Sequence, residues 1–247
     1  MSKFQKKAEN ELLLKKRLKL NKKTQKNDFQ LFLFKKLNLA SDKVILDLGC
    51  GHGQTSLSIL KTKNYLKLYS VDINGKFINN LKLLKKKYNN FYPINKNMDL
   101  IKFKNKKFHL IIMSYCFYYS KNYEKLLLNL IKLLKKNGRI VIANPCKPHF
   151  LVNFISSIHT INKTVFKSLE VSDYIYKFCK KYKLVNVKKF TFKNEKTLNK
   201  NDILQSYTNS TMFEKNKLDL VKQRIKKLKN SKIKFFKNTC LIEIIKK

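Results

Sequence analysis

The chain has 247 residues, of which 43% are hydrophobic. This length predicts one domain with a sizeable core, to which a small lid can be appended. Its formal net charge of +41 would suit a polyanionic partner, such as nucleic acid or an anionic membrane. Nearly all of that charge is lysine, whereas a phosphate-reading surface usually recruits arginine, and the only arginines are Arg17, Arg139 and Arg224. We therefore interpret the charge as the lysine bias of an A/T-rich coding sequence and do not favour a nucleic-acid partner.

The cysteines argue against a metal site and against a disulfide framework. They are odd in number, and no two have the C-x-x-C spacing. Reduced thiols in a cytoplasmic protein are the expectation. No apolar run reaches the roughly 18–20 residues of a membrane span, and the N-terminus lacks the apolar region of a signal peptide. The cysteines are Cys50, Cys116, Cys146, Cys179 and Cys240.

Residues 1–39 predict one or two helices, because leucine and phenylalanine recur along a lysine-rich segment. The apolar run Val44 to Leu48 then predicts a buried strand, and Gly49, Gly51 and Gly53 follow it. The chain has only five glycines, so this grouping is not compositional noise. Glycine adopts positive φ freely and lets a ligand approach the backbone. A strand, a glycine turn and a helix start together aim backbone N–H groups at a ligand.

The run from Asp47 to Gly53, Asp-Leu-Gly-Cys-Gly-His-Gly, resembles motif I of the class I S-adenosylmethionine (SAM)-dependent methyltransferases. That motif is an apolar strand followed by Asp/Glu-x-Gly-x-Gly-x-Gly. The spacing does not fit the Gly-x-Gly-x-x-Gly of dinucleotide-binding folds, and the Gly-Lys-Ser/Thr of a Walker A loop is absent. The resemblance implies that SAM is the cofactor and that Asp47, Gly49, Gly51 and Gly53 bind it. A glycine turn without a ligand is the alternative.

Residues 65–74 predict a second strand that carries Asp72 near its end. In a Rossmann-like fold an acid at this place accepts hydrogen bonds from the ribose hydroxyls. The resemblance assigns this role to Asp72 and places Ile73 beside the adenine ring. The other interpretation is that Asp72 caps the next helix.

Residues 75–88 predict a lysine-faced helix, and residues 91–95 predict a short third strand. Methyltransferases of this class often place an acid in the loop that follows, where its carboxylate accepts a hydrogen bond from the adenine amino group. Asp99 fits this position, with the backbone of Leu100 beside it. Loop aspartates are common, so this assignment also depends on the resemblance.

Residues 108–114 predict the fourth strand, and its end, with Ser114, should face the methionine half of the cofactor. The next residues contain neither the Asp/Asn-Pro-Pro-Tyr/Phe motif of base-amine methyltransferases nor the Pro-Cys of pyrimidine C5 methyltransferases. The aromatic residues at 117–119 are more typical of the small-molecule branch of the family. Packing beneath a lid is an equally good interpretation of them.

Residues 121–136 predict an amphipathic helix that Asn137 and Gly138 terminate, and residues 139–145 predict the fifth strand. The following segment, 146–182, does not alternate like a strand, and we expect a helix from Val171 to Tyr182. Residues 184–192 predict the sixth strand.

Residues 196–230 predict a second helical segment, and residues 235–245 predict a last strand that is antiparallel and inserted beside the sixth. The order of elements predicts an α/β fold, a Rossmann-like, seven-stranded mixed sheet with a helical lid insertion. We expect residues 1–39 to cover the cofactor, although packing on the sheet is equally compatible. Residues 40–247 would form the SAM-binding domain, with lid segments around 146–182 and 196–230.

The implied chemistry is in-line transfer of the sulfonium-bound methyl group, for which the protein mainly aligns the reactants and excludes water. Our leading hypothesis is a small-molecule O- or N-methyltransferase, and the lysines would suit an acidic metabolite. An RNA or protein methyltransferase and a non-catalytic SAM-binding module are the alternatives. If the acceptor needs a base, His149, His159 and Tyr118 are candidates. Structural roles are the plainer interpretation of each histidine.

Overall fold

The computed structural model describes residues 10–40, 43–62, 65–105 and 107–247. The chain divides into two compact units, and each is described by itself. Unit 1 consists of Met1–Phe29, Pro145–Glu170 and Thr191–Thr239, and unit 2 consists of Gln30–Asn144, Val171–Phe190 and Cys240–Lys247.

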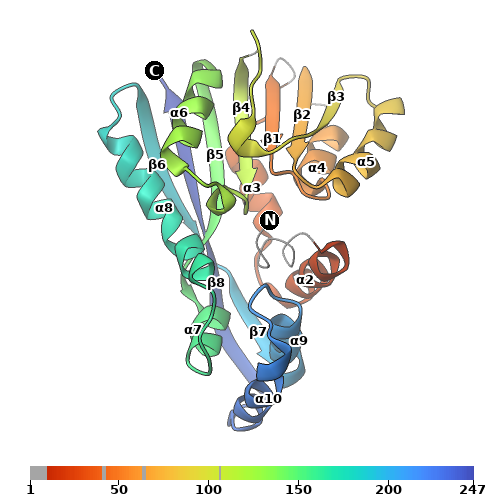
Figure 1. The fold of residues 1–247 in the computed structure, drawn as a ribbon, viewed down its shortest axis with the longest axis vertical. Coiled ribbons are helices and arrows are strands. Elements are labelled where there is room, and N and C mark those ends of the chain that lie inside the picture. Colours follow the sequence, from red (N-terminus) through yellow and green to blue (C-terminus); the bar gives the residue numbers. More distant parts are fainter. Residues whose placement is uncertain (1–9, 41–42, 63–64, 106) are drawn as a thin grey trace. The chain divides into compact units, whose positions relative to one another are not determined.

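The structure contains an eight-stranded sheet, in which seven strands follow the order β3-β2-β1-β4-β5-β8-β6 and β7 pairs with β8 (Figure 1). The pairs β1–β2, β2–β3, β1–β4 and β4–β5 are parallel. This order confirms the predicted Rossmann-like mixed sheet, with the last strand inserted beside the sixth. The strands are β1 (Val44–Leu48), β2 (Lys67–Asp72), β3 (Phe91–Asn95), β4 (Phe108–Ser114), β5 (Leu134–His149), β6 (Val185–Phe192), β7 (Glu195–Asn199) and β8 (Lys232–Lys246).

The core of unit 2 forms around β1 and β4, where almost every side chain is buried. Such continuous apolar runs are typical of parallel strands that are covered on both faces. The helices bury one apolar side each; in α6, for example, Leu126, Leu127, Leu130 and Ile131 face inward. The helices of unit 2 are α3 (Phe29–Leu37, whose first residue belongs to unit 1), α4 (Gln54–Thr62), α5 (Gly75–Lys82) and α6 (Tyr123–Leu133), and α8 (Lys163–Lys181) contributes its second half.

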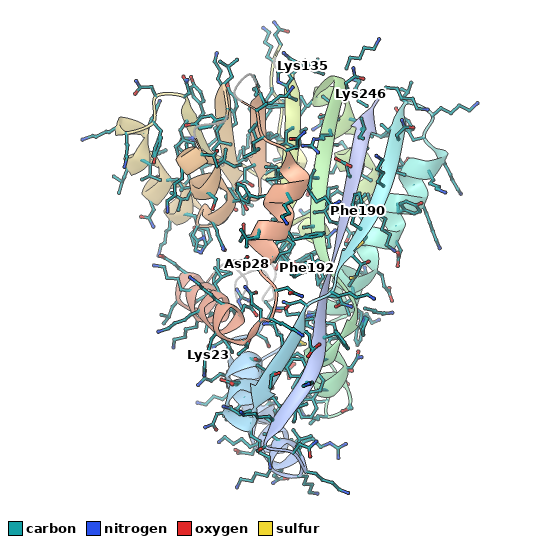
Figure 2. The ribbon with its side chains drawn as sticks, turned by 180° about the vertical axis from the view of Figure 1, so that it is seen from behind. Lys23, Asp28, Lys135, Phe190, Phe192 and Lys246 are labelled. Atoms are coloured by element: carbon teal, nitrogen blue, oxygen red, sulfur yellow. The ribbon has the colours of Figure 1, made fainter. Side chains whose placement is uncertain are left out.

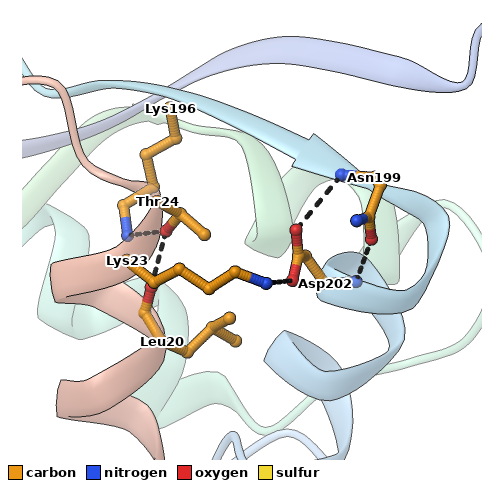
Figure 3. Close-up of polar contacts among 6 residues, drawn as sticks. All are labelled: Leu20, Lys23, Thr24, Lys196, Asn199 and Asp202. Atoms are coloured by element: carbon orange, nitrogen blue, oxygen red, sulfur yellow. Dashed lines mark hydrogen bonds and ion pairs between the residues drawn. The ribbon is translucent and has the colours of Figure 1, made fainter.

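Unit 1 contains α2 (Glu11–Thr24), α7 (Phe150–Ser156), α9 (Lys200–Thr208) and α10 (Leu218–Lys226). The side chain of Asn199 and the carboxylate of Asp202 form a capping box that begins α9. Lys23 of α2 pairs with the same Asp202 at 3.2 Å, so α2 and α9 are joined (Figure 3). The cover and lid roles expected for residues 1–39, 146–182 and 196–230 stay predictions.

The predicted helix end at Asn137 and Gly138 is wrong, because α6 ends at Leu133 and both residues lie within β5. Asn137 does adopt a left-handed φ of 60°. A Cβ on Gly138 would lie 2.8 Å from the carbonyl oxygen of Lys135 and 2.9 Å from that of Phe108. Close backbone approach, and not a helix cap, therefore requires this glycine.

The expected helical segment at 196–230 is also wrong at its start, where β7 pairs antiparallel with β8. The inward positions of β7 are Lys196 and Leu198. A lysine at an inward position hides the alternation by which a strand is recognised. Two boundaries differ as well, since β5 continues to His149 and α8 begins at Lys163.

Lysine side chains project outward from the ribbon of both units, as Figure 2 shows. Lys135 and Lys136 are typical, being exposed at the beginning of β5. This distribution agrees with lysine on solvated faces. Within the described ranges, none of the helices combines the length and apolar character needed to cross a membrane.

Arg139 fastens α3 to the sheet of unit 2. Its Nη1 donates to the carbonyl of Lys36 at 2.8 Å and to Oε1 of Glu243 at 2.7 Å, and its Nη2 donates to the carbonyl of Leu37. The last carbonyls of a helix have no partner within the helix, and a cation beside them is favourable.

We predict that Arg139→Met lowers the free energy of unfolding by about 2–4 kcal/mol, since it leaves the largely buried Glu243 and two helix carbonyls without a donor. Urea denaturation measures the change. The matched control is Arg224→Met, at an exposed position of α10, with an effect within about 0.5 kcal/mol. Equal losses in the two variants would contradict this account of Arg139.

Candidate functional site

The turn between β1 and α4 is left-handed at three residues. Gly49, Gly51 and Gly53 have φ values of 73°, 56° and 87°, a region that favours glycine. The N–H groups of Gly49 and Cys50 both donate to the carbonyl of Val71, at 2.7 and 3.0 Å. The turn is thereby fastened to the end of the neighbouring strand β2.

The three glycines differ in what surrounds them. A Cβ on Gly49 would lie 2.5 Å from Sγ of Cys116, and one on Gly53 would lie 2.5 Å from Cδ2 of Leu81. A Cβ on Gly51 would meet no atom of the described protein within 4 Å. Gly49 and Gly53 thus permit close packing, and Gly51 presents bare backbone to open space.

Asp72, the last residue of β2, joins this turn to the next helix. Its Oδ2 accepts from the N–H of Gly51 at 2.8 Å, and its Oδ1 accepts from the N–H of Asn74 at 2.8 Å. Burial raises the pKa of the Asp72 carboxyl, and these N–H donors act in the opposite direction. A carboxylate has about four acceptor positions, so Asp72 keeps acceptor capacity beside these N–H donors.

Apolar side chains stand exposed beside the acids at this edge. Ile73 is 47% exposed and Leu100 is 66% exposed. Single exposed apolar residues are common, but two that flank carboxylates offer a surface for a flat ring.

Asp99 ties two loops together. Its Oδ1 accepts from the hydroxyl of Ser120 at 2.5 Å, and its Oδ2 accepts from the N–H of Lys121 at 3.0 Å. The backbone N–H of Asp99 donates to Oδ1 of Asn97 at 2.9 Å, so the Asn97 side chain holds the backbone of Asp99 in place. Sequence reasoning missed Ser120 and Asn97, although the spacing Asn-x-Asp is a recognisable signal for a turn closed by a side chain.

Asp47 lies inside unit 2 and not on an open surface. It is 1% exposed, and the hydroxyl of Ser56 donates to its Oδ2 at 2.5 Å. That hydroxyl also lies 2.7 Å from the hydroxyl of Ser70 on β2. Burial is the main cause that raises the pKa of Asp47 from 3.8 to about 6, and the charge of Asp72 adds to it. Sequence reasoning did not find the two serines, since neither belongs to a motif.

The end of β4 carries Ser114 and the aromatic residues that follow. Tyr115 has a left-handed φ of 58°, and its N–H donates to the carbonyl of Ala143 at 2.8 Å. Cys116 donates from Sγ to the carbonyl of Leu48 at 3.0 Å, which brings this segment against β1. Burial raises the pKa of the Tyr118 phenol well above its usual value, so at neutral pH it stays protonated.

The two candidate histidines belong to unit 1. His149 is 7% exposed, and its Nδ1 has no partner among the described residues. Burial, with the charges of Lys237 and Lys196, lowers the pKa of His149 to about 3. His159 has both ring nitrogens engaged, with Nδ1 2.9 Å from the carbonyl of Thr160 and Nε2 3.2 Å from the hydroxyl of Tyr207.

A cavity of about 590 Å³ in unit 1 reaches His159. Its lining contains one carboxylate, Glu214, and one ammonium group, Lys217, among apolar and amide side chains. The lining residues are Ile158, His159, Thr160, Ile161, Asn162, Glu214, Lys217 and Leu220.

The structure therefore gathers most predicted site residues in unit 2 and places two elsewhere. The first four strands are parallel, so their carboxyl ends meet at one edge of the sheet, which is where open α/β sheets bind ligands. The residues at or after those ends are Asp47, Gly49, Gly51, Gly53, Asp72, Ile73, Asp99, Leu100, Ser114 and Tyr118. His149 and His159 are in unit 1.

The raised pKa of Asp47 has a consequence for stability. The folded state binds this proton more tightly than the unfolded state, so stability falls as pH rises from about 4 to about 6. We predict that Asp47→Asn raises the free energy of unfolding by about 3 kcal/mol at pH 7 and leaves it nearly unchanged at pH 4.

Urea denaturation at both pH values tests this prediction. Asp219→Asn is the matched control, because its carboxylate is 85% exposed on α10 and pairs only with Lys222 in the described structure. A gain for Asp47→Asn that is the same at pH 4 and pH 7 would show that the cost of the buried charge is not its cause.

Comparison with known proteins identifies the family to which the chain belongs. Residues 18–200 match the model of a family described as a methyltransferase domain. A search of curated protein sequences returned no match.

Several solved structures have the same fold. The YcgJ protein of Bacillus subtilis is similar at a TM-score of 0.64 and 14% identity, with 88% of this chain and 97% of that chain covered. The MccD protein has a TM-score of 0.61 and 14% identity, with 88% and 96% covered. The plantazolicin methyltransferase BpumL, solved with a triazolic desmethylPZN analog and SAH, has a TM-score of 0.59 and 18% identity, with 98% and 94% covered.

These identities establish the fold alone, whereas the family match spans more than half of the chain and includes the glycine turn and Asp72. The chain belongs to the methyltransferase domain family and is a class I SAM-dependent methyltransferase.

Proposed function

We propose that this enzyme transfers the methyl group of SAM to a carboxylate oxygen of a small acidic metabolite. The proposal has two parts, which are the residues that hold the cofactor and the nature of the acceptor. The contact between Asp72 and Gly51 supports the assignment of the cofactor residues. The chemistry of the three candidate bases supports the assignment of the acceptor.

The residues at the carboxyl edge of the sheet fit the cofactor. Gly51 leaves backbone open to a ligand, and Asp72 keeps acceptor capacity for the two ribose hydroxyls. Ile73 and Leu100 offer exposed apolar surface for adenine, and Asp99 would accept from the adenine amino group. Ser114 would contact the methionine half. Gly49, Gly53 and Asp47 act behind this surface by shaping the turn.

SAM supplies a methyl group on a positively charged sulfur, which is a good leaving group. What remains for the protein is to orient the acceptor and exclude water. An amine or phenol acceptor would also need a base. A carboxylate is ionised at neutral pH and needs none.

None of the three candidate residues is suited to remove a proton. Tyr118 stays protonated at neutral pH and can only donate, and His159 has both ring nitrogens engaged. His149 is neutral with a pKa of about 3, which makes it a weak base. This shared feature favours an acceptor that arrives already ionised. BpumL, of the same fold, was solved with a triazolic desmethylPZN analog, which is compatible with a small acceptor.

The cofactor assignment predicts that Asp72→Ala weakens SAM binding at least about tenfold, because one lost charge-assisted acceptor is worth about 1.5–3 kcal/mol. Gly51→Ala should weaken it similarly, since its Cβ would occupy the open side of the turn without touching the protein. Isothermal titration calorimetry measures both variants, and circular dichroism checks their fold.

Asp219→Ala is the control for the lost charge, with unchanged SAM affinity expected at that exposed position. If Asp72→Ala binds SAM as tightly as the native protein, the ribose role of Asp72 is wrong.

The acceptor assignment predicts that methyl-labelled SAM labels the metabolite fraction of a lysate, and that mild base releases the label as methanol, since methyl esters hydrolyse and N-methyl groups do not. The same experiment with Asp72→Ala measures the background labelling. Label in RNA or protein would favour the macromolecular alternative, and base-stable label in metabolites would exclude a carboxylate acceptor.

A further inference from the structure

Two lysines of unit 1 share one neutral partner and, among the described residues, pair with no acid. Lys196 of β7 is 4% exposed, although lysine is almost never so buried unless it is paired. Its Nζ donates to Oδ1 of Asn21 at 2.7 Å. It also donates to the hydroxyl oxygen of Thr24 at 3.2 Å, which is the contact drawn in Figure 3. Both partners are neutral side chains of α2, so they solvate the charge without balancing it.

A second ammonium group reaches the same atom. Lys237 of β8 donates from Nζ to Oδ1 of Asn21 at 3.2 Å. One amide oxygen therefore lies between two like charges, in a place from which water is largely excluded. Within the described ranges, neither Lys196 nor Lys237 forms an ion pair with a carboxylate.

Asp202, the acid drawn in Figure 3, is bonded to other groups. Asp202 accepts from Lys23 at 3.2 Å, and it closes the capping box of α9 with the backbone N–H of Asn199. The side chain of Lys23 is exposed, so water could solvate its charge, yet this lysine is the one that pairs with the Asp202 carboxylate. In the described structure the buried Lys196 thus donates to neutral oxygens, while Asp202 is paired with Lys23.

The third group is His149, whose pKa is lowered by burial and by the charges of Lys237 and Lys196. It is buried, and its Nδ1 has no hydrogen-bond partner among the described residues. Buried polar atoms in native proteins are almost always bonded, so such a nitrogen requires an explanation. A ligand oxygen would supply the partner when Nδ1 carries the proton.

We propose that Lys196, Lys237 and His149 form a binding site for one compact anion, a carboxylate or phosphate group. This site is independent of the methyl-transfer proposal, since it is built from unit 1 alone. Lys237 is only partly buried, which leaves the site a route to solvent. The two ammonium groups would supply charge, and Nδ1 of His149 a directed hydrogen bond.

The titration behaviour of the lysines is what such a site requires. Burial first, and then the charge of Lys237, lower the pKa of Lys196 to about 7. Burial, and then the charge of Arg17, lower that of Lys237 to about 8. An anion beside them would oppose both shifts, because an opposite charge favours the protonated amine.

Calorimetric titration of the full chain with inorganic phosphate, and separately with acetate, tests the proposal at constant ionic strength in chloride. We expect one site per chain for at least one of them, with affinity at least tenfold lower in Lys196→Met and in Lys237→Met. The tighter anion identifies whether the natural ligand group is a phosphate or a carboxylate.

Lys234→Met is the matched control, because Lys234 lies on the same strand at an exposed position whose side chain points to the opposite face from Lys237. It removes the same charge and should leave the affinity unchanged. Equal losses in all three variants would mean that the anion responds only to the overall charge of +41, and the proposal would be overturned.

Nuclear magnetic resonance of lysine side chains labelled with nitrogen-15 provides a second measurement, with Lys196→Met assigning the Lys196 signal. The bound anion should raise the pKa of Lys196 toward 10.5, its ordinary value. No binding of either anion, or binding that leaves this pKa where it was, would equally overturn the proposal. SAM affinity should stay unchanged in Lys196→Met, which separates this site from the cofactor site.

Discussion

The structure of the site depends on one contact, in which the carboxylate of Asp72 accepts the N–H of Gly51 at 2.8 Å. This bond fixes the middle of a left-handed turn to the end of the adjacent strand. The backbone bonds from Gly49 and Cys50 to Val71 act on the same pair of elements. Because both strand ends are held together, a carboxylate with acceptor capacity to spare lies beside a backbone surface that no side chain covers.

The buried groups behind the turn show what this arrangement costs. Asp47 is held by Ser56, which also contacts Ser70, so one small polar network joins β1, α4 and β2. An ionised carboxylate in such a place is unfavourable, as its raised pKa of about 6 shows. Proteins tolerate costs of this kind at functional sites, where the position of a loop matters more than the last increment of stability.

The parts of the fold that follow from local chemistry could be predicted from the sequence. The strand at 108–114 was predicted with its observed bounds, since its apolar run identifies a buried strand, and the short strand at 91–95 was also predicted with its observed bounds. The end of α6 was not predicted, because Asn137 and Gly138 have the composition of a helix cap. The need for glycine comes from the backbone carbonyls of Lys135 and of Phe108 on β4, and the second of these is a long-range contact. β7 was missed because its inward lysine is explained only by partners on α2, which is far away in the sequence. Likewise, motif spacing indicates Asp72 and Gly51, but the serines behind Asp47 belong to no motif.

The central claim is that the turn held by Asp72 binds SAM. Amide chemical shifts measured during a SAM titration test it most directly, with Gly51 and Asp72 assigned. The account predicts that the amide signals of Gly51 and Ile73 move together and saturate with the affinity measured by calorimetry. If SAM binds while those signals stay in place and other regions shift, the cofactor lies elsewhere and the account is contradicted.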